Sequence, residues 1–279
     1  MILFIVNPIS GHGNKTRIVS RLNRKDCRVV YTEYAGHAEK LAREAEEKIV
    51  VAVGGDGTVN EVARGLIGSD KTLGIIPKGS GDGLALHLGL SHDLNRSIRT
   101  IEAGNTRYLD AATINGRHFF SVCGVGLDAI ISERFAKSGR RGLASYIEQA
   151  IHSWKGHTAD RYELEVDGEV KVHEAVMVTV GNSDQWGNGA KVTPLADSND
   201  GILDITVVED FKDIEIPMLA YRLMTGTVNM APNIHCYKGK HIRISREKAG
   251  PAHADGEWFE AGKTLDIRII EHALKVIVP

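Results

Sequence analysis

The side chains best suited to chemistry lie in residues 54–61, which read Gly-Gly-Asp-Gly-Thr-Val-Asn-Glu. An apolar, β-branched run precedes them and apolar residues at helical spacing follow, so the pattern predicts a strand, a turn and a helix. A turn without β-carbons lets backbone N–H groups and the positive helix end approach a phosphate. Asp56 would repel a bare phosphate unless a divalent cation lay between them. The stretch therefore predicts a magnesium–nucleotide site, with a purely structural turn as the alternative.

Two more glycine-containing turns follow predicted strands. Residues 73–77 lead into Lys-Gly-Ser-Gly-Asp-Gly at 78–83, and residues 2–6 lead into Asn-Pro-Ile-Ser-Gly-His-Gly at 7–13. Strand ends of this kind meet at the sheet edge where open α/β sheets bind ligands. Neither the Walker pattern nor the dinucleotide Gly-x-Gly-x-x-Gly pattern fits, which argues against P-loop NTPases and ordinary NAD(P) dehydrogenases.

Several separated motifs occur in the same order as in the diacylglycerol kinase / sphingosine kinase catalytic family, which the chain therefore resembles. Among the members of that family, the bacterial lipid kinases are the closest to this chain in length. They are Asn7-Pro8 with Ser10-Gly11, residues 54–62, residues 76–81, residues 124–129, residues 200–205 and Asp255-Gly256-Glu257. The resemblance implies an ATP-dependent lipid kinase that uses Mg²⁺ and phosphorylates a lipid hydroxyl, either of diacylglycerol or of a sphingoid-type acceptor. An NAD kinase-like phosphotransferase and a catalytically silent nucleotide- or lipid-binding protein are the alternatives.

The residues expected at the nucleotide come from all three turns and the end of the second strand. Asp56 would serve both the phosphates and Mg²⁺. For Asn60 a helix cap is an equal alternative, and for Thr32 an ordinary strand position. The full expected set is Asn7, Ser10, Gly11, Thr32, Gly54, Gly55, Asp56, Gly57, Thr58, Asn60 and Ser80.

Asp255-Gly256-Glu257 is expected to carry the general base. Spacing alone favours a β-turn or hairpin here, but the family resemblance implies a catalytic role. Glu257 is the expected proton acceptor, with Asp255 next, and Asp56 completes the catalytic set. Asp128 opens a predicted helix, where the helix dipole favours an acidic residue. An aspartate near this position contacts the lipid head group in sphingosine kinases, so Asp128 is the candidate substrate residue.

The loop at residues 197–202, Asp-Ser-Asn-Asp-Gly-Ile, suits either a hard oxygen-ligated cation or a solvated turn. In bacterial members the corresponding loop resembles a second, structural Mg²⁺ site. Carried over by position, Asp200 would supply a carboxylate, and Asp197 and Ile202 mainly carbonyl oxygens.

The second glycine turn departs from the diacylglycerol kinase pattern Gly-Thr-x-Asn-Asp-Phe-Ala-Arg. Ser80 replaces Thr, Asp82 replaces Asn, Gly83 replaces Asp and Leu86 replaces Arg. These changes put diacylglycerol specificity in doubt and favour a sphingoid-type or other lipid acceptor slightly.

The order of predicted elements indicates two domains. Strands and helices alternate over the first hundred residues, which predicts a doubly wound α/β nucleotide-binding domain at residues 1–106. Strands joined by tight turns then prevail, with Asn115-Gly116 and Asp167-Gly168 as hairpin signals. They predict a mainly-β lipid-substrate domain at residues 107–279, built as an antiparallel β-sandwich or curled sheet.

Composition limits the partners and the location. The chain has 279 residues, 42% of them hydrophobic and 25% charged, as expected for globular domains, and its net charge of −2 gives no electrostatic case for nucleic acid. No apolar run approaches the ~18 residues of a membrane span. We therefore expect a cytoplasmic protein that meets its lipid substrate at the membrane surface, and a homodimer remains open. The spacing of the 3 cysteines and 12 histidines indicates no zinc site.

Overall fold

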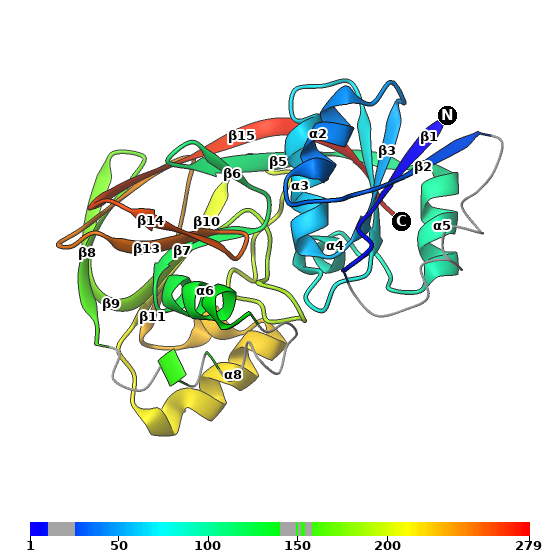
Figure 1. Cartoon of the computed structure of the whole chain (residues 1–279). Coiled ribbons are helices and arrows are strands. Elements are labelled where there is room, and N and C mark those ends of the chain that lie inside the picture. Colours follow the sequence, from blue (N-terminus) through cyan, green and yellow to red (C-terminus); the bar gives the residue numbers. More distant parts are fainter. Residues whose placement is uncertain (11–25, 140–148, 150–151, 154–157) are drawn as a thin grey trace. The chain divides into compact units, whose positions relative to one another are not determined.

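The computed structural model describes residues 1–10, 26–139, 149, 152–153 and 158–279, and they form two compact units (Figure 1). The first unit is Met1–Asp110 together with His272–Pro279, and the second is Ala111–Glu271. The chain passes from one to the other within β5 (Thr106–Ile114) and returns within β15 (Thr264–Ile277).

The first unit is built on a parallel sheet. Strand β1 (Ile2–Val6) lies between β2 (Cys27–Tyr31) and β3 (Ile49–Gly54), β4 (Thr72–Pro77) follows β3, and the end of β15 pairs with β4. The β-branched runs are buried, as a sheet covered on both faces requires. The described helices of this unit are α2 (His37–Glu44), α3 (Asp56–Leu66), α4 (Gly83–His87) and α5 (Leu94–Ala103).

The register of this sheet brings the glycine turns to one edge. Val6 lies opposite Val53, and Gly54 lies opposite Pro77, so β1, β3 and β4 end at nearly the same level. The turns after these strands therefore leave the sheet side by side, as the strand order in the sequence predicts.

The second unit is an antiparallel sheet with two described α-helices. Strand order runs β14-β13-β7-β9-β8-β12-β15, and β10 lies between β9 and β11. In addition to β15 and the last part of β5, this unit contains the strands β6 (Arg117–Phe119), β7 (Val122–Gly126), β8 (Asp160–Val166), β9 (Glu169–Gly181), β10 (Leu203–Glu209), β11 (Ile234–Gly239), β12 (His241–Arg246), β13 (Gly250–Ala254) and β14 (Glu257–Ala261). The helices are α6 (Leu127–Ser138) and α8 (Ile216–Thr225), with short 3₁₀ turns at Asp213–Glu215 and Val228–Met230.

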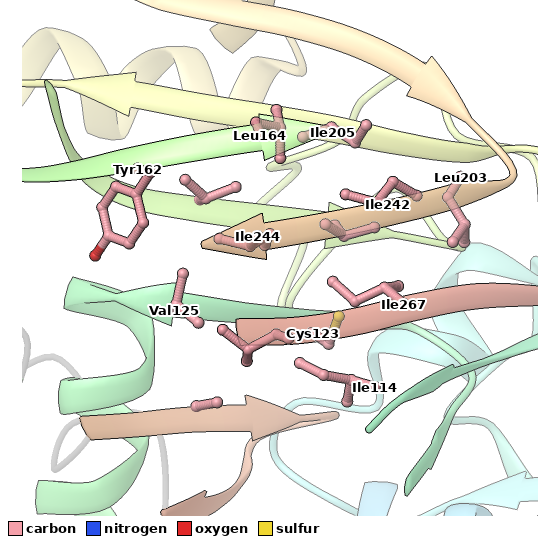
Figure 2. Close-up of a cluster of buried hydrophobic side chains, with 14 of the residues drawn as sticks. Ile114, Cys123, Val125, Tyr162, Leu164, Leu203, Ile205, Ile242, Ile244 and Ile267 are labelled. Atoms are coloured by element: carbon pink, nitrogen blue, oxygen red, sulfur yellow. The ribbon is translucent and has the colours of Figure 1, made fainter. Parts of the chain in front are cut away.

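A hydrophobic core inside the sheet holds the strands of the second unit together, and a second cluster joins the sheet to helices α6 and α8. Inward side chains from strands far apart in the sheet meet in the core inside it, which shows that the sheet curls around them (Figure 2). The figure labels Ile114, Cys123, Val125, Tyr162, Leu164, Leu203, Ile205, Ile242, Ile244 and Ile267. The expected fold class, a doubly wound α/β part followed by an antiparallel β part, is confirmed.

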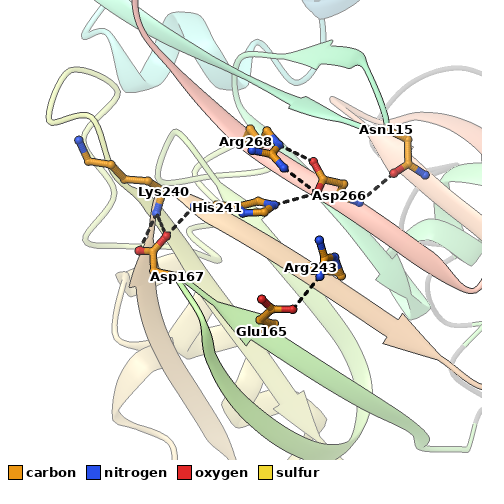
Figure 3. A network of polar contacts seen from close by, with 8 residues as sticks. All are labelled: Asn115, Glu165, Asp167, Lys240, His241, Arg243, Asp266 and Arg268. Atoms are coloured by element: carbon orange, nitrogen blue, oxygen red, sulfur yellow. Dashed lines mark hydrogen bonds and ion pairs between the residues drawn. The ribbon is translucent and has the colours of Figure 1, made fainter.

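Polar contacts between strands fix the register on the outside of this sheet (Figure 3). His241 Nε2 lies 2.7 Å from Asp266 Oδ2, and Arg268 Nε donates to Asp266 Oδ1 at 2.7 Å. The backbone N–H of Asp266 donates to Asn115 Oδ1 at 2.8 Å. The Arg268 guanidinium, and after it His241, hold the pKa of Asp266 below its usual value, while burial acts in the opposite direction. This cluster links β12, β15 and the turn after β5.

The predicted hairpins are confirmed, and a third of the same type appears. Asn115 (φ 48°) and Gly116 (φ 78°) both lie in the left-handed region, as do Asp167 (φ 48°) and Gly168 (φ 91°). Two positive φ values in succession mark the type I′ turn that suits the twist of a hairpin. Asp255-Gly256 has the same conformation, with φ values of 49° and 79°, between β13 and β14.

Candidate functional site

The two glycine turns after β3 and β4 touch each other. A β-carbon on Gly55 would lie 2.9 Å from the Gly79 Cα, and one on Gly79 would lie 2.7 Å from the Gly55 Cα. A β-carbon on Gly54 would lie 2.5 Å from Thr58 Oγ1. Close packing therefore explains why these three positions are glycine. A β-carbon on Gly57, by contrast, would meet nothing within 4 Å. Gly57 is exposed at the start of α3, where space for a ligand is its better explanation.

Asp56 joins the two turns through hydrogen bonds. As the first residue of α3, it accepts the backbone N–H of Asp82 and that of Gly83, each at 2.8 Å. Burial raises the pKa of Asp56, while these two N–H donors act in the opposite direction. The residue as a whole is partly exposed, so a ligand can approach it.

Asp82, noted in the sequence only as a departure, is a structural partner of Asp56. Its backbone is left-handed (φ 48°) and its side chain is buried. Asp82 Oδ1 accepts the Gly79 N–H at 3.0 Å, and Oδ2 lies 2.9 Å from His92 Nε2. Burial, followed by the negative charge of Asp56, raises the pKa of Asp82 to about 6. Two neighbouring carboxylates form an oxygen-rich, acidic group, and that donor chemistry fits Mg²⁺.

The turn after β1 lies against the same helix. Asn7 Nδ2 donates to Thr58 Oγ1 at 3.0 Å, and Asn7 Oδ1 accepts the backbone N–H of Ile9 at 3.0 Å. The Ser10 hydroxyl donates to the Asn7 carbonyl oxygen at 3.3 Å. At the end of β2, Thr32 is buried and its N–H donates to the Val6 carbonyl oxygen at 3.0 Å. Gly11 lies outside the described residues.

Two residues of the first motif have clear structural placements. Asn60 is buried within α3, and the N-terminus of that helix has no side-chain cap, so the capping interpretation of Asn60 is wrong. Glu61 accepts the backbone N–H groups of Gly36 at 2.9 Å and Ala38 at 3.1 Å, and it thereby supports the start of α2. Ser80, by contrast, is exposed in the second turn.

In the second unit, Asp255 is held by the backbone. Its carboxylate accepts the N–H groups of Phe120 at 2.8 Å, Ser121 at 2.8 Å and Val122 at 3.0 Å. Burial raises the pKa of Asp255 to about 6, although these three donors favour the ionised form. Glu257 begins β14 on the other side of the turn and is exposed. Asp255 therefore anchors the turn, and Glu257 is presented by it.

Asp128 lies in the interior of the second unit. Its carboxylate accepts the Ala129 N–H at 2.7 Å and the Thr179 hydroxyl at 2.6 Å. His253 Nε2 lies 3.2 Å from Asp128 Oδ2, and His253 Nδ1 accepts the Gly256 N–H at 3.3 Å. These bonds assign the imidazole proton to Nε2, which donates to the carboxylate.

The Asp128–His253 pair is a connection that sequence reasoning missed. It ties the start of α6 to the Asp255-Gly256 turn through a buried histidine. The available signal was His253 itself, a polar residue within the otherwise apolar run at 251–254 that precedes the turn.

The predicted metal loop is a tight turn in the structure. Ile202 N–H donates to Asp200 Oδ1 at 3.0 Å, and Asp200 N–H donates to the Asp197 carbonyl oxygen at 3.3 Å. Both aspartates are exposed. One oxygen of Asp200 is thus already engaged within the loop.

Among the described residues, no helix is long and apolar enough to span a membrane.

Two family profiles match the chain in succession. The diacylglycerol kinase catalytic domain matches residues 1–114, and the YegS C-terminal NAD kinase beta sandwich-like domain matches residues 121–278. A "Probable lipid kinase YegS" of Escherichia coli is 28% identical over 99% of this chain and 95% of its own length. A "Diacylglycerol kinase" of Bacillus subtilis is 26% identical over 91% of this chain and 88% of its own length.

Solved structures show the same fold. A diacylglycerol kinase crystal structure from Bacillus anthracis has a TM-score of 0.78 at 23% identity and covers 100% of this chain and 96% of its own. An NAD kinase from Archaeoglobus fulgidus, in complex with ATP, has a TM-score of 0.59 at 14% identity and covers 99% of this chain and 93% of its own. Taken with the two consecutive domain matches, these likenesses lead to one conclusion: the chain belongs to the lipid kinase family that joins a diacylglycerol kinase catalytic domain to a YegS-type C-terminal domain.

Proposed function

We propose that this chain transfers the γ-phosphate of ATP to the hydroxyl group of a lipid. The observation that carries the proposal is Asp56, a partly exposed residue at the start of α3 whose carboxylate is held in place by two N–H groups of the neighbouring glycine turn. It lies in the domain that matches the diacylglycerol kinase catalytic family. The reaction forms a bond between the lipid oxygen and the γ-phosphorus and breaks the bond to the ADP oxygen.

The first unit would bind the nucleotide. Helix α3 presents the N–H groups of its first turn and its positive dipole end, which favour phosphate. Asp56 would hold Mg²⁺, with the buried Asp82 as its support, and a bound Mg²⁺ neutralises phosphate charge. Asn7 positions Thr58 through the bond between their side chains. The remaining proposed contacts are Ser10, Gly11, Thr32, Gly54, Gly55, Gly57, Asn60 and Ser80.

The second unit would supply the proton acceptor. Glu257 is exposed and follows a turn that Asp255 fixes, so its carboxylate is the proposed base for the lipid hydroxyl. In a loose transition state the proton leaves late, so the main task of this carboxylate is to orient the hydroxyl and accept its proton at the end. Asp128 would act on the acceptor side by holding His253 and, through it, the same turn.

Helix α8 is the proposed membrane contact. None of its residues is buried; Leu219 and Leu223 pack against a core cluster, whereas Met218, Tyr221 and Met224 are 55%, 63% and 60% exposed. An exposed apolar group of this kind marks an interaction site. It would hold the enzyme at the membrane surface, where a lipid acceptor is found.

The acceptor is proposed to be a sphingoid-type or other non-diacylglycerol lipid. Gly83 replaces an aspartate of the diacylglycerol kinase pattern, and its N–H is bonded to Asp56. The smaller residue leaves more room beside the phosphates for a different head group.

The test is a panel of diacylglycerols, sphingoid bases, ceramides and monoacylglycerols, each incubated with protein and Mg-ATP, with NAD as an additional acceptor. Phosphorylation of one lipid class supports the proposal and names the acceptor. NADP formation alone would favour the NAD kinase-like alternative, which the fold of the Archaeoglobus enzyme motivates. ATP binding without any product would indicate a silent binding protein.

The loop at 197–202 is proposed as a structural Mg²⁺ site, with Asp200 as the carboxylate and with Asp197 and Ile202 as carbonyl donors. Its short turn and exposed oxygens support this. Chelation should lower the melting temperature of the original chain but not that of Asp200→Ala. An identical response in both would leave a solvated turn.

A further inference from the structure

Three side chains of the second unit, remote from one another in the sequence, converge at one place. They are His173 on β9, Glu209 at the end of β10 and His235 on β11. Glu209 Oε1 lies 3.2 Å from His173 Nδ1 and 3.0 Å from His235 Nε2. One ligand atom from each residue lies within 4.8 Å of the others. Such separations allow one ion to contact all three atoms after small side-chain movements.

A β-bulge brings these residues to one face. Val208 pairs with Met177, but Glu209 pairs with Ala175, so Val176 is the additional residue. Because side chains alternate along a strand, a regular register would turn His173 to the opposite face from Glu209. The bulge therefore places the His173 side chain on the same face of the sheet as Glu209. Bulges often redirect a side chain in this way next to active sites. On the other side, His235 pairs with Val207 and needs no correction.

The arrangement includes a partner for the far side of one imidazole. His173 Nε2 lies 2.9 Å from the hydroxyl oxygen of Tyr237, while Nδ1 faces Glu209. A metal-bound histidine usually has its second nitrogen fixed in this way, which orients the ring and sets the tautomer. The rings of His173 and His235 have centroids 4.8 Å apart. Only 10% of the His173 side chain is exposed, against 38% for His235, so the group opens to solvent on one side.

We propose that His173, Glu209 and His235 bind a divalent transition-metal ion of the zinc type. Two imidazoles and one carboxylate suit Zn²⁺ and its first-row neighbours, whereas Mg²⁺ and Ca²⁺ prefer sites made entirely of oxygen. Three protein ligands leave a fourth position for water. Since the ligands come from three strands, the ion would connect β9, β10 and β11 at the rim of the core. The proposal concerns a site separate from the kinase residues and does not depend on lipid kinase activity.

The competing explanation is a hydrogen-bonded cluster without metal. Lys171 Nζ lies 5.2 Å from the centroid of the Tyr237 ring, and this positive charge works against a second cation nearby. The two explanations differ in what added metal does. If the three residues form only a hydrogen-bonded cluster, Zn²⁺ should not change the stability of the protein. If they form the proposed site, the protein should reach its full stability only with Zn²⁺ bound.

The experiment uses the full chain without a histidine tag, stripped by chelator and dialysed. Zn²⁺ alone is titrated by calorimetry, and thermal unfolding is followed with and without it. We expect one saturable ion per chain and a rise in melting temperature of about 5 °C at ~100-fold excess over Kd. His235→Ala and Glu209→Gln, at the more exposed ligands, should each weaken binding at least about 10-fold, as removal of ligation does.

His241→Ala is the matched control, because His241 forms a histidine–carboxylate pair with Asp266 in the same unit outside the cluster (Figure 3). This variant should bind Zn²⁺ like the original chain. Absence of saturable binding, or unchanged binding in both His235→Ala and Glu209→Gln, would overturn the proposal. Substitution by Co²⁺ gives a further readout, because a site with bound imidazoles shows visible absorption that the ligand variants must lose.

Discussion

Asp56 and Asp255, one in each unit, are both carboxylates held by backbone N–H groups, but they are held differently. Asp56 accepts two N–H groups from the neighbouring turn and begins helix α3, whose positive dipole end favours an anion. Asp255 accepts three, from consecutive residues of another strand connection, and lies in a left-handed turn. The first carboxylate lies at a helix start that can also bind phosphate, whereas the second lies in a hairpin turn and holds that turn to a neighbouring strand connection. We infer that Asp56 contributes mainly to activity and Asp255 mainly to the position of Glu257.

The largest expected effect is the loss of activity when Asp56 is replaced. Asp56→Ala should lower kcat by at least about 10²–10³-fold, since it removes a preorganised charge from the phosphate region. The melting temperature should also fall, because the N–H groups of two buried residues, Asp82 and Gly83, lose their acceptor, but it should fall by less than in Asp255→Ala, where three N–H groups lose theirs. Equal losses of kcat and of folded protein would mean that Asp56 is a structural residue like Asp255.

Asp255→Ala should act first on stability. Three N–H groups lose their acceptor, and one buried, unpaired donor alone costs about 1–3 kcal/mol, so we expect a loss of about 3 kcal/mol or more in unfolding free energy. Urea unfolding measures it. Glu257→Gln, at an exposed side chain, is the control that should lose activity with little loss of stability. A stable but inactive Asp255→Ala would instead identify Asp255 as the proton acceptor.

Asp82 predicts a pH effect in the metal-free protein. Its pKa is raised from 3.8 to about 6, so between these values the folded chain binds more protons than the unfolded chain. The contribution of Asp82 to stability is therefore full below pH 3.8 and is lost as the pH rises through about 6. Asp82→Asn keeps the shape without the charge and should be about 2 kcal/mol more stable than the original at pH 7.5. The two curves should converge near pH 4.

The control for this measurement is Asp70→Asn, which changes an exposed aspartate of the same unit. It should shift stability by much less at pH 7.5. A gap between Asp82→Asn and the original chain that does not narrow in acid would refute the assignment to the Asp82 carboxyl group.

His253 should have a smaller effect, as a positioning residue. His253→Gln weakens the link between Asp128 and the Gly256 N–H, and we expect kcat to fall about 10-fold with KM for ATP unchanged. Thr179→Val takes a hydrogen bond from the same carboxylate without touching the turn and should preserve kcat. If both variants lower kcat alike, Asp128 rather than His253 controls the turn.

The smallest effect is expected at α8. Met224→Ser together with Tyr221→Ser should lower the rate on lipid in vesicles about 3-fold, because less apolar surface reaches the bilayer. The rate on a dispersed short-chain acceptor should stay the same. If the ratio of the variant's rate to the original chain's rate is the same on vesicles and on the dispersed acceptor, α8 does not contact the membrane.

The sequence predicted what depends on local pattern. Glycine turns after β-branched runs located the nucleotide edge, and Asn-Gly and Asp-Gly pairs located hairpins, because φ > 0 restricts the residues there. Contacts across the sequence were not predictable. The Asp56–Asp82 link spans 26 positions and the His253–Asp128 link spans 125, so each depends on tertiary packing. The return of residues 272–279 to the first unit is another long-range feature. The histidine cluster was missed for the same reason, because a β-bulge rather than spacing assembles it.

Transfer of label from ATP to lipid tests the central claim most directly. Original chain and Asp56→Ala are incubated with γ-labelled Mg-ATP and a mixed lipid extract, and the products are identified by mass spectrometry. We expect a labelled lipid phosphate from the original chain, reduced at least about 10²-fold by the substitution. Absence of any labelled lipid, or equal labelling by both proteins, would contradict the assignment of Asp56 and of lipid kinase activity to this chain.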